Sequence, residues 1–243
     1  MKDIKKIVKD SYGKIATQNS LCCGGNSCCG GNTNDISKII RYSDTQLSDV
    51  PSGANLGLGC GNPLAIASLK KGDVVLDLGS GAGFDAFLAS RQVGDSGKVI
   101  GVDMTPEMIN KAKDIAIKGN VKNVEFRLGD IEVLPVDDDS IDIIISNCVI
   151  NLAPDKEKVF RESYRVLKTG GRMMISDVVI SKELPKEMKE DETLLTGCVS
   201  GAILKKDYLE LLSKAGFSKI IISKEAPMFL DNYGLSITFS AVK

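Results

Sequence analysis

Between residues 72 and 180 the sequence alternates short apolar runs with amphipathic segments, and this alternation restricts the possible folds more than any other feature. Runs of the buried-strand type are found at 74–78, 98–103, 124–128, 141–145 and 172–179. Helical patterns are found between them, at about 84–93, after Thr105-Pro106 and at roughly 155–167. Strands that alternate with helices predict an α/β fold with a parallel sheet and right-handed crossovers.

Residues 1–69 are predicted to form an N-terminal extension outside this alternation. Apolar residues at near-helical spacing indicate an amphipathic helix within the first twenty residues. A tandem repeat at residues 22–33, CCGGNS followed by CCGGNT, predicts a mobile loop. One short helical stretch is expected after it. The Asn62-Pro63 pair then predicts the start of a helix that ends near residue 69.

Residues 70–180 are predicted to form the core, with the segment Lys168–Gly171 ending its last helix. Residues 181–243 are predicted to complete the sheet. They comprise an insertion at 181–204, a helix at about 205–215, and two strands near 219–224 and 236–242. We expect these two strands to pair antiparallel at a sheet edge.

The run Asp77-Leu78-Gly79-Ser80-Gly81-Ala82-Gly83 places three glycines on a strand-to-helix turn, where the backbone can approach a ligand closely. A dinucleotide fingerprint uses the same turn, but it spaces its glycines G-x-G-x-x-G and presents a helix N-terminus to a pyrophosphate. Here the spacing is G-x-G-x-G, and the anionic Asp77 suits the cationic amino end of S-adenosylmethionine better. Dinucleotide binding stays open as an alternative.

Carboxylates follow the next two strands. Asp103 can accept hydrogen bonds from both ribose hydroxyls, and Asp130 offers a carboxylate to the adenine amino group beside the apolar Ile131. The motifs DLGSGAG, VDM, GDIEVLP and LKTGGR occur in the order used by class I, Rossmann-like S-adenosylmethionine methyltransferases, and the chain resembles that family over about residues 70–180. The resemblance implies the sheet order 3-2-1-4-5-7-6 with an antiparallel last strand. The expected cofactor-binding residues are Asp77, Gly79, Ser80, Gly81, Gly83, Asp103, Met104, Asp130, Ile131 and Asn147.

The chain contains seven cysteines and no histidine. The N-terminus lacks the apolar stretch of a secretory signal, so we expect a cytoplasmic protein. In that reducing compartment, sparse and unevenly spaced cysteines favour reactive or ligating thiols over a disulfide scaffold. Cys148 directly follows the fourth strand, at the edge where open parallel sheets bind ligands. For Cys148 alone, a buried cysteine that acts as a small hydrophobe is an equal alternative.

Cys60 and Cys198 lie in the glycine-containing loops GLGCGNP and TGCVSG, which core cysteines rarely occupy. Together with Cys148, these contexts resemble the arsenite methyltransferase family over roughly residues 50–205. The resemblance implies that Cys148 and Cys198 hold trivalent arsenic through all methylation steps, and that Cys60 is an additional thiol for the first step and for disulfide exchange. These three cysteines are the expected catalytic residues and As(III) ligands. The redox candidates are Cys22, Cys23, Cys28 and Cys29, for which an adventitious metal-binding tail or a four-thiolate zinc site are alternatives.

The chemistry of arsenic agrees with this set of residues. Trivalent arsenic is soft and thiophilic, and its lone pair carries no proton that a histidine base would have to remove. Methyl transfer formally oxidises arsenic, and a thiol pair can return two electrons by closing a disulfide. A thiol reductant, thioredoxin or glutathione, is then expected as electron source. The expected function is methylation of arsenite and then methylarsenite, for arsenic detoxification.

Two other functions remain open at this point. One is a methyltransferase of the quinone or sterol type with incidental cysteines, and the other is a non-catalytic, thiol-based arsenic or metal-binding protein. The formal net charge of −1 and the lack of a basic stripe with interleaved aromatics argue against nucleic acid as a partner. No apolar run reaches membrane-spanning length, so no membrane partner is expected.

Overall fold

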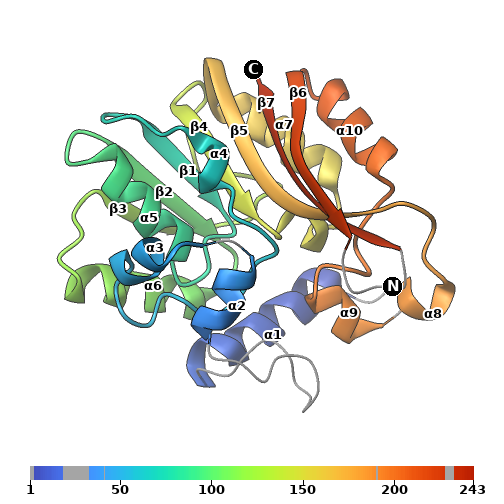
Figure 1. Ribbon diagram of the computed structural model, residues 1–243, viewed down its shortest axis with the longest axis horizontal. Coiled ribbons are helices and arrows are strands. Elements are labelled where there is room, and N and C mark those ends of the chain that lie inside the picture. Colours follow the sequence, from blue (N-terminus) through green and yellow to red (C-terminus); the bar gives the residue numbers. More distant parts are fainter. Residues whose placement is uncertain (1–2, 19–32, 41, 190, 228–232) are drawn as a thin grey trace.

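A seven-stranded sheet forms the centre of the computed structural model, which describes residues 3–18, 33–40, 42–189, 191–227 and 233–243 (Figure 1). The strand order is β3-β2-β1-β4-β5-β7-β6. The strands are β1 (Val74–Leu78), β2 (Lys98–Asp103), β3 (Val124–Leu128), β4 (Ile141–Asn147), β5 (Leu167–Ile180), β6 (Ser218–Pro227) and β7 (Gly234–Val242). Strands β1 to β5 pair in parallel, and β7 is antiparallel to both β5 and β6. The expected α/β fold and sheet order are confirmed.

Helices cover both faces of the sheet, and this explains why its central strands are apolar on both sides. Val75 and Ile143 point into a core shared with α5 (Phe84–Val93) and α6 (Pro106–Lys118). Leu76 and Ile144 point into the opposite core, shared with the 3-10 helix η1 (Ile150–Leu152), α7 (Lys156–Val166) and α10 (Lys205–Lys214). Alternate residues of one strand therefore supply two cores.

The N-terminal helix α1 (Ile4–Gln18) lies across the carboxyl end of the sheet, against α6, η1 and α9 (Glu192–Thr196) (Figure 1). The insertion also contains α8 (Lys186–Lys189). After the N-terminal repeat there are two helices, α2 (Thr33–Ile39) and α3 (Asp44–Asp49), where one was predicted. The second begins because Ser43 and Gln46 form a reciprocal capping box.

One predicted helix end and the predicted role of residues 168–171 are wrong. Helix α4 (Leu64–Ala67) has Pro63 as its N-cap and ends early, since Ser68 adopts a left-handed conformation with φ of 46°. The side chain of Asn62 instead donates to Gln46. Segment 168–171 does not end α7, which stops at Val166; it belongs to β5, and Gly170 N donates to the carbonyl of Lys243.

The predicted loop of the tandem repeat, with Cys22, Cys23, Cys28 and Cys29, lies outside the described residues except for Thr33, which begins α2. Within the described ranges, no helix is both long and apolar enough to cross a membrane.

Candidate active site

The turn between β1 and α5, residues 79–83, can be formed only with glycine at its tightest points. A methyl group at Gly79, where φ is 65°, would lie 2.2 Å from Cγ2 of Val149. One at Gly83, where φ is 91°, would lie 2.7 Å from Cζ of Phe126. The turn therefore packs directly on Val149, the residue that follows Cys148.

Buried polar atoms beside this turn lack partners. Asp77 Oδ2, Ser80 Oγ and Ser146 Oγ have no hydrogen-bond partner among the described residues. Burial raises the pKa of Asp77 well above its usual value, and the charges of Asp85 and Asp103 raise it further. Unpaired buried acceptors are costly, so this region fits a ligand that brings cationic and hydrogen-bond donor groups. S-adenosylmethionine has both.

Asp103 ends β2 and closes the turn from the other side. Its Oδ2 accepts from Gly81 N at 3.0 Å, and its Oδ1 accepts from Thr105 N at 2.8 Å. Burial raises the pKa of Asp103, although these hydrogen bonds act in the opposite direction. The next residue, Met104, packs against the apolar cluster that contains Cys198.

The predicted adenine-binding loop contacts α1. Lys5 Nζ lies 2.5 Å from Asp130 Oδ2 and 2.6 Å from Glu132 Oε2, and Ile131 between them is buried. The Asp130 carboxylate is therefore already paired with a cation of the protein. Its predicted contact with adenine stays a prediction, and the sequence analysis did not predict that Lys5 would pair with it.

The three described cysteines come together at the carboxyl end of β4, and we call Cys60, Cys148 and Cys198 the thiol cluster. The thiol of Cys198 donates to the carbonyl of Cys148 at 2.6 Å, and that of Cys60 donates to the carbonyl of Ser176 at 3.6 Å. All three are free cysteines and pack in or against one apolar cluster. Cys148 N also donates to Ser176 O at 2.8 Å, so Ser176 of β5 contacts both the backbone of Cys148 and the thiol of Cys60.

The thiols of this cluster have raised pKa values. Burial is the main cause for Cys60. For Cys148, the hydrogen bond with Cys198 lowers the pKa, but the contact with Cys60 and burial outweigh it and leave the pKa well above the usual range. For Cys198, the hydrogen bond with Cys148 and burial both raise the pKa well above the usual range. The free thiols are therefore protonated at neutral pH, and they can replace hydroxyl groups on a soft acceptor with release of water.

A buried carboxylate adjoins the thiols. An oxygen of Asp177 and the Sγ atoms of Cys60 and Cys148 all lie within 4.8 Å of one another. Burial raises the pKa of Asp177 to about 6. Sequence reasoning missed this residue, although an aspartate within a largely apolar strand is a usable signal.

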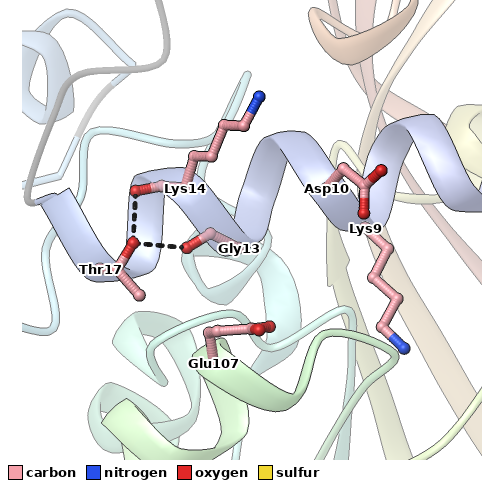
Figure 2. Close-up of a pocket in the computed structure, with 6 residues that line it drawn as sticks. All are labelled: Lys9, Asp10, Gly13, Lys14, Thr17 and Glu107. Atoms are coloured by element: carbon pink, nitrogen blue, oxygen red, sulfur yellow. Dashed lines mark hydrogen bonds between the residues drawn. The ribbon is translucent and has the colours of Figure 1, made fainter.

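Two surface hollows lie apart from these residues. One of about 340 Å³ lies between α1 and α6, where Lys9 and Lys14 extend away from each other beside Glu107 (Figure 2). The other, of about 630 Å³, lies along β3 and the end of α6. Neither is lined by a predicted site residue, so we place the candidate active site at residues 79–83, called the cofactor turn below, and at the thiol cluster.

The fold is that of a class I methyltransferase domain, and residues 69–216 match the family described as a methyltransferase domain. The arsenite methyltransferase of Halobacterium salinarum is 48% identical over 91% of this chain and 59% of its own length. That of Aquipseudomonas alcaligenes is 39% identical over 97% of this chain and 66% of its own length. The solved structure of an arsenic(III) S-adenosylmethionine methyltransferase from Chlamydomonas reinhardtii has a TM-score of 0.70 at 32% identity, covering 88% of this chain and 75% of that one.

This chain belongs to the arsenite methyltransferase family. It spans about three fifths of the length of the first of these curated relatives and 66% of the second.

Proposed function

We propose that this protein transfers the methyl group of S-adenosylmethionine to trivalent arsenic held by cysteine thiols, acting on arsenite and then on methylarsenite, for arsenic detoxification in the cytoplasm. The observation that carries the proposal is the thiol cluster beside the cofactor turn. Val149 joins the two, because it follows Cys148 in the chain and packs on Gly79. The names of the relatives support the choice of arsenic as acceptor.

On the cofactor side, Asp77, Ser80 and Asp103 are proposed to hold the amino acid and ribose parts of S-adenosylmethionine. When bound, this cofactor supplies a methyl group on a positively charged sulfur. The buried carboxylates favour that positive charge, and apolar neighbours of the thiols such as Met104 and Val149 exclude water from the transfer path.

On the acceptor side, Cys148 and Cys198 are proposed to hold arsenic through every step, with Cys60 as third ligand for arsenite. Each arsenic hydroxyl leaves as water with the proton of one thiol, so no separate base is required. The arsenic lone pair is the nucleophile, and the protein contributes mainly by aligning it.

Methyl transfer raises arsenic formally from the trivalent to the pentavalent state. Two thiols can return two electrons by forming a disulfide, with arsenic restored to the trivalent state. For the arsenite step, Cys60 and Cys148 are candidates because their Sγ atoms lie in the same 4.8 Å group. A reductant of the thioredoxin or glutathione type would then reopen the disulfide, and the four N-terminal cysteines are further redox candidates.

The test is incubation with arsenite or methylarsenite, a dithiol and S-adenosylmethionine, followed by separation of the arsenic species. Cys148→Ser and Cys198→Ser should abolish methylation of both substrates, because a serine oxygen is a hard, weak ligand for arsenic. Cys60→Ser should lose activity on arsenite but keep it on methylarsenite, which offers only two exchangeable groups. Full activity of all three variants would contradict the proposal, and arsenic binding without consumption of S-adenosylmethionine would indicate a thiol sink instead.

A further inference from the structure

Three polar side chains from distant parts of the chain, two buried and one partly buried, meet beside the Cys60 loop. Tyr42 precedes Ser43, the N-cap of α3, Asp85 lies in the first turn of α5, and Asn147 ends β4. The Tyr42 hydroxyl donates to Asp85 Oδ1 at 2.5 Å. Burial, followed by the charge of Asp85, raises the pKa of Tyr42 well above its usual value, so the hydroxyl keeps the proton that it donates. Neither Tyr42 nor Asp85 has a part in the function proposed above.

The amide of Asn147 connects this pair to Cys60. Its Nδ2 donates toward Tyr42 Oη at 3.0 Å, Asp85 Oδ2 at 3.1 Å and the carbonyl of Gly61 at 2.8 Å. Its Oδ1 accepts from the backbone N–H of Cys60 at 3.0 Å. Because Tyr42 and Asp85 both present acceptors to Nδ2, they fix which end of the amide faces Cys60.

The Cys60 loop is held closely on this amide. A methyl group at Gly59, where φ is 147°, would lie 2.9 Å from Asn147 Nδ2. On the other side, Ser236 Oγ donates to the carbonyl of Cys60 at 3.0 Å. Since Cys148 is the next residue after Asn147, one side chain sets the position of the Cys60 backbone relative to Cys148.

We propose that Tyr42 and Asp85 are positioning residues that act through Asn147 to hold the Cys60 thiol at the thiol cluster. The expected difference between the two substrates rests on the proposed function, in which Cys60 serves only the arsenite step. Loosening the Cys60 loop should therefore slow methylation of arsenite and spare methylation of methylarsenite. A general structural role would reduce both rates equally.

The variants are Tyr42→Phe, which removes only the hydroxyl, and Asp85→Asn, which replaces one acceptor oxygen by a donor. Tyr164→Phe is the matched control, because Tyr164 lies on α7 and packs on Phe217, in the core that α7 shares with α10. With saturating S-adenosylmethionine, we expect kcat for arsenite to fall about tenfold or more in the first two variants. We expect kcat for methylarsenite to stay within about threefold of the wild-type value, and the control to keep both rates.

A second readout needs no arsenic. Labelling with iodoacetamide, followed by mass spectrometry of the peptides, should show faster modification of Cys60 relative to Cys198 in Tyr42→Phe than in the wild type. If the wild type methylates no arsenic, the proposed function fails and this ratio alone decides whether the network holds Cys60. An unchanged labelling ratio in both variants, or equal losses on arsenite and methylarsenite, would overturn the inference.

Discussion

Replacing Asp177 by asparagine should stabilise the protein at neutral pH, although it alters a residue beside the thiol cluster. Asp177 is fully buried in β5, and burial raises its pKa from 3.8 to about 6. The folded protein therefore binds this proton more tightly than the unfolded chain does. Above pH 6 the folded state contains an ionised carboxylate that burial disfavours. The difference between the pKa of Asp177 in the folded protein and its ordinary value corresponds to about 3 kcal/mol of unfolding free energy.

Asparagine can take the place of the carboxylate because its hydrogen-bond partners can adapt. Asp177 Oδ1 accepts from Val178 N at 2.8 Å and from Asn151 Nδ2 at 2.9 Å, and an amide oxygen can accept both. Asp177 Oδ2 accepts from the Tyr208 hydroxyl at 3.1 Å. That hydroxyl can rotate and accept from the new amide nitrogen. The substitution thus removes the charge with little change in shape.

The measurement is urea denaturation of wild type and Asp177→Asn at several pH values from 4 to 8. For the wild type, the contribution of Asp177 to the unfolding free energy falls as pH rises from about 4 to about 6 and is level above that. Asp177→Asn lacks this fall. The difference in unfolding free energy in favour of the variant should therefore grow over the same pH interval, to at most about 3 kcal/mol. An advantage that does not change with pH, or a variant less stable than wild type at pH 7.5, would refute the reasoning.

Three further outcomes are expected. Asp103→Ala should weaken S-adenosylmethionine binding by roughly 1.5–3 kcal/mol in calorimetry while arsenic binding persists, and unchanged cofactor affinity would reject the assignment. Gly61→Ala should lower the melting temperature, because its methyl group would lie 2.7 Å from Cβ and Oγ of Ser176; a wild-type melting curve would contradict the packing described. Asp155→Ala removes the N-cap that accepts from Lys158 N at 3.1 Å, and should cost about 1 kcal/mol of unfolding free energy at pH 7. Since this hydrogen bond lowers the pKa of Asp155 in the folded state, that cost should shrink as pH falls through this pKa, and urea titrations at pH 7 and pH 3 would show whether it does.

The sheet could be predicted because its strands contain their own signal. Strands β1, β2 and β3 and helix α5 begin and end where the apolar periodicity placed them. The errors occur where a distant contact outweighs a local preference. Lys168–Gly171 has the composition of a helix end, yet backbone hydrogen bonds to Lys243 make it part of β5.

The members of the thiol cluster could be named from sequence, but their surroundings could not. The register of β4 and β5 places Asn147 opposite Ser176, and this pairing brings Asp177 to the thiols. Nothing near Asp177 in the chain indicates Cys60 as its neighbour. In the same way, the contacts of Tyr42 with Asp85 and of Asn147 with Cys60 depend on how segments far apart in sequence pack together.

The N-terminal helix belongs to the site as much as the sheet does. Lys5 of α1 binds Asp130 on the cofactor side, and the Tyr12 hydroxyl donates to the carbonyl of Thr196 at 3.1 Å, two residues before Cys198. Cys148 and Cys198 both have left-handed backbones, with φ of 62° and 64°, a conformation that side chains other than glycine adopt only when surrounding contacts hold it. The N–H of Cys148 donates to Ser176 of β5, and the N–H of Cys198 donates to the carbonyl of Leu195 in α9, a helix that packs against α1. One helix therefore contacts both the 130–132 loop and the segment that contains Cys198, whose thiol donates to the carbonyl of Cys148, 50 residues away in the chain.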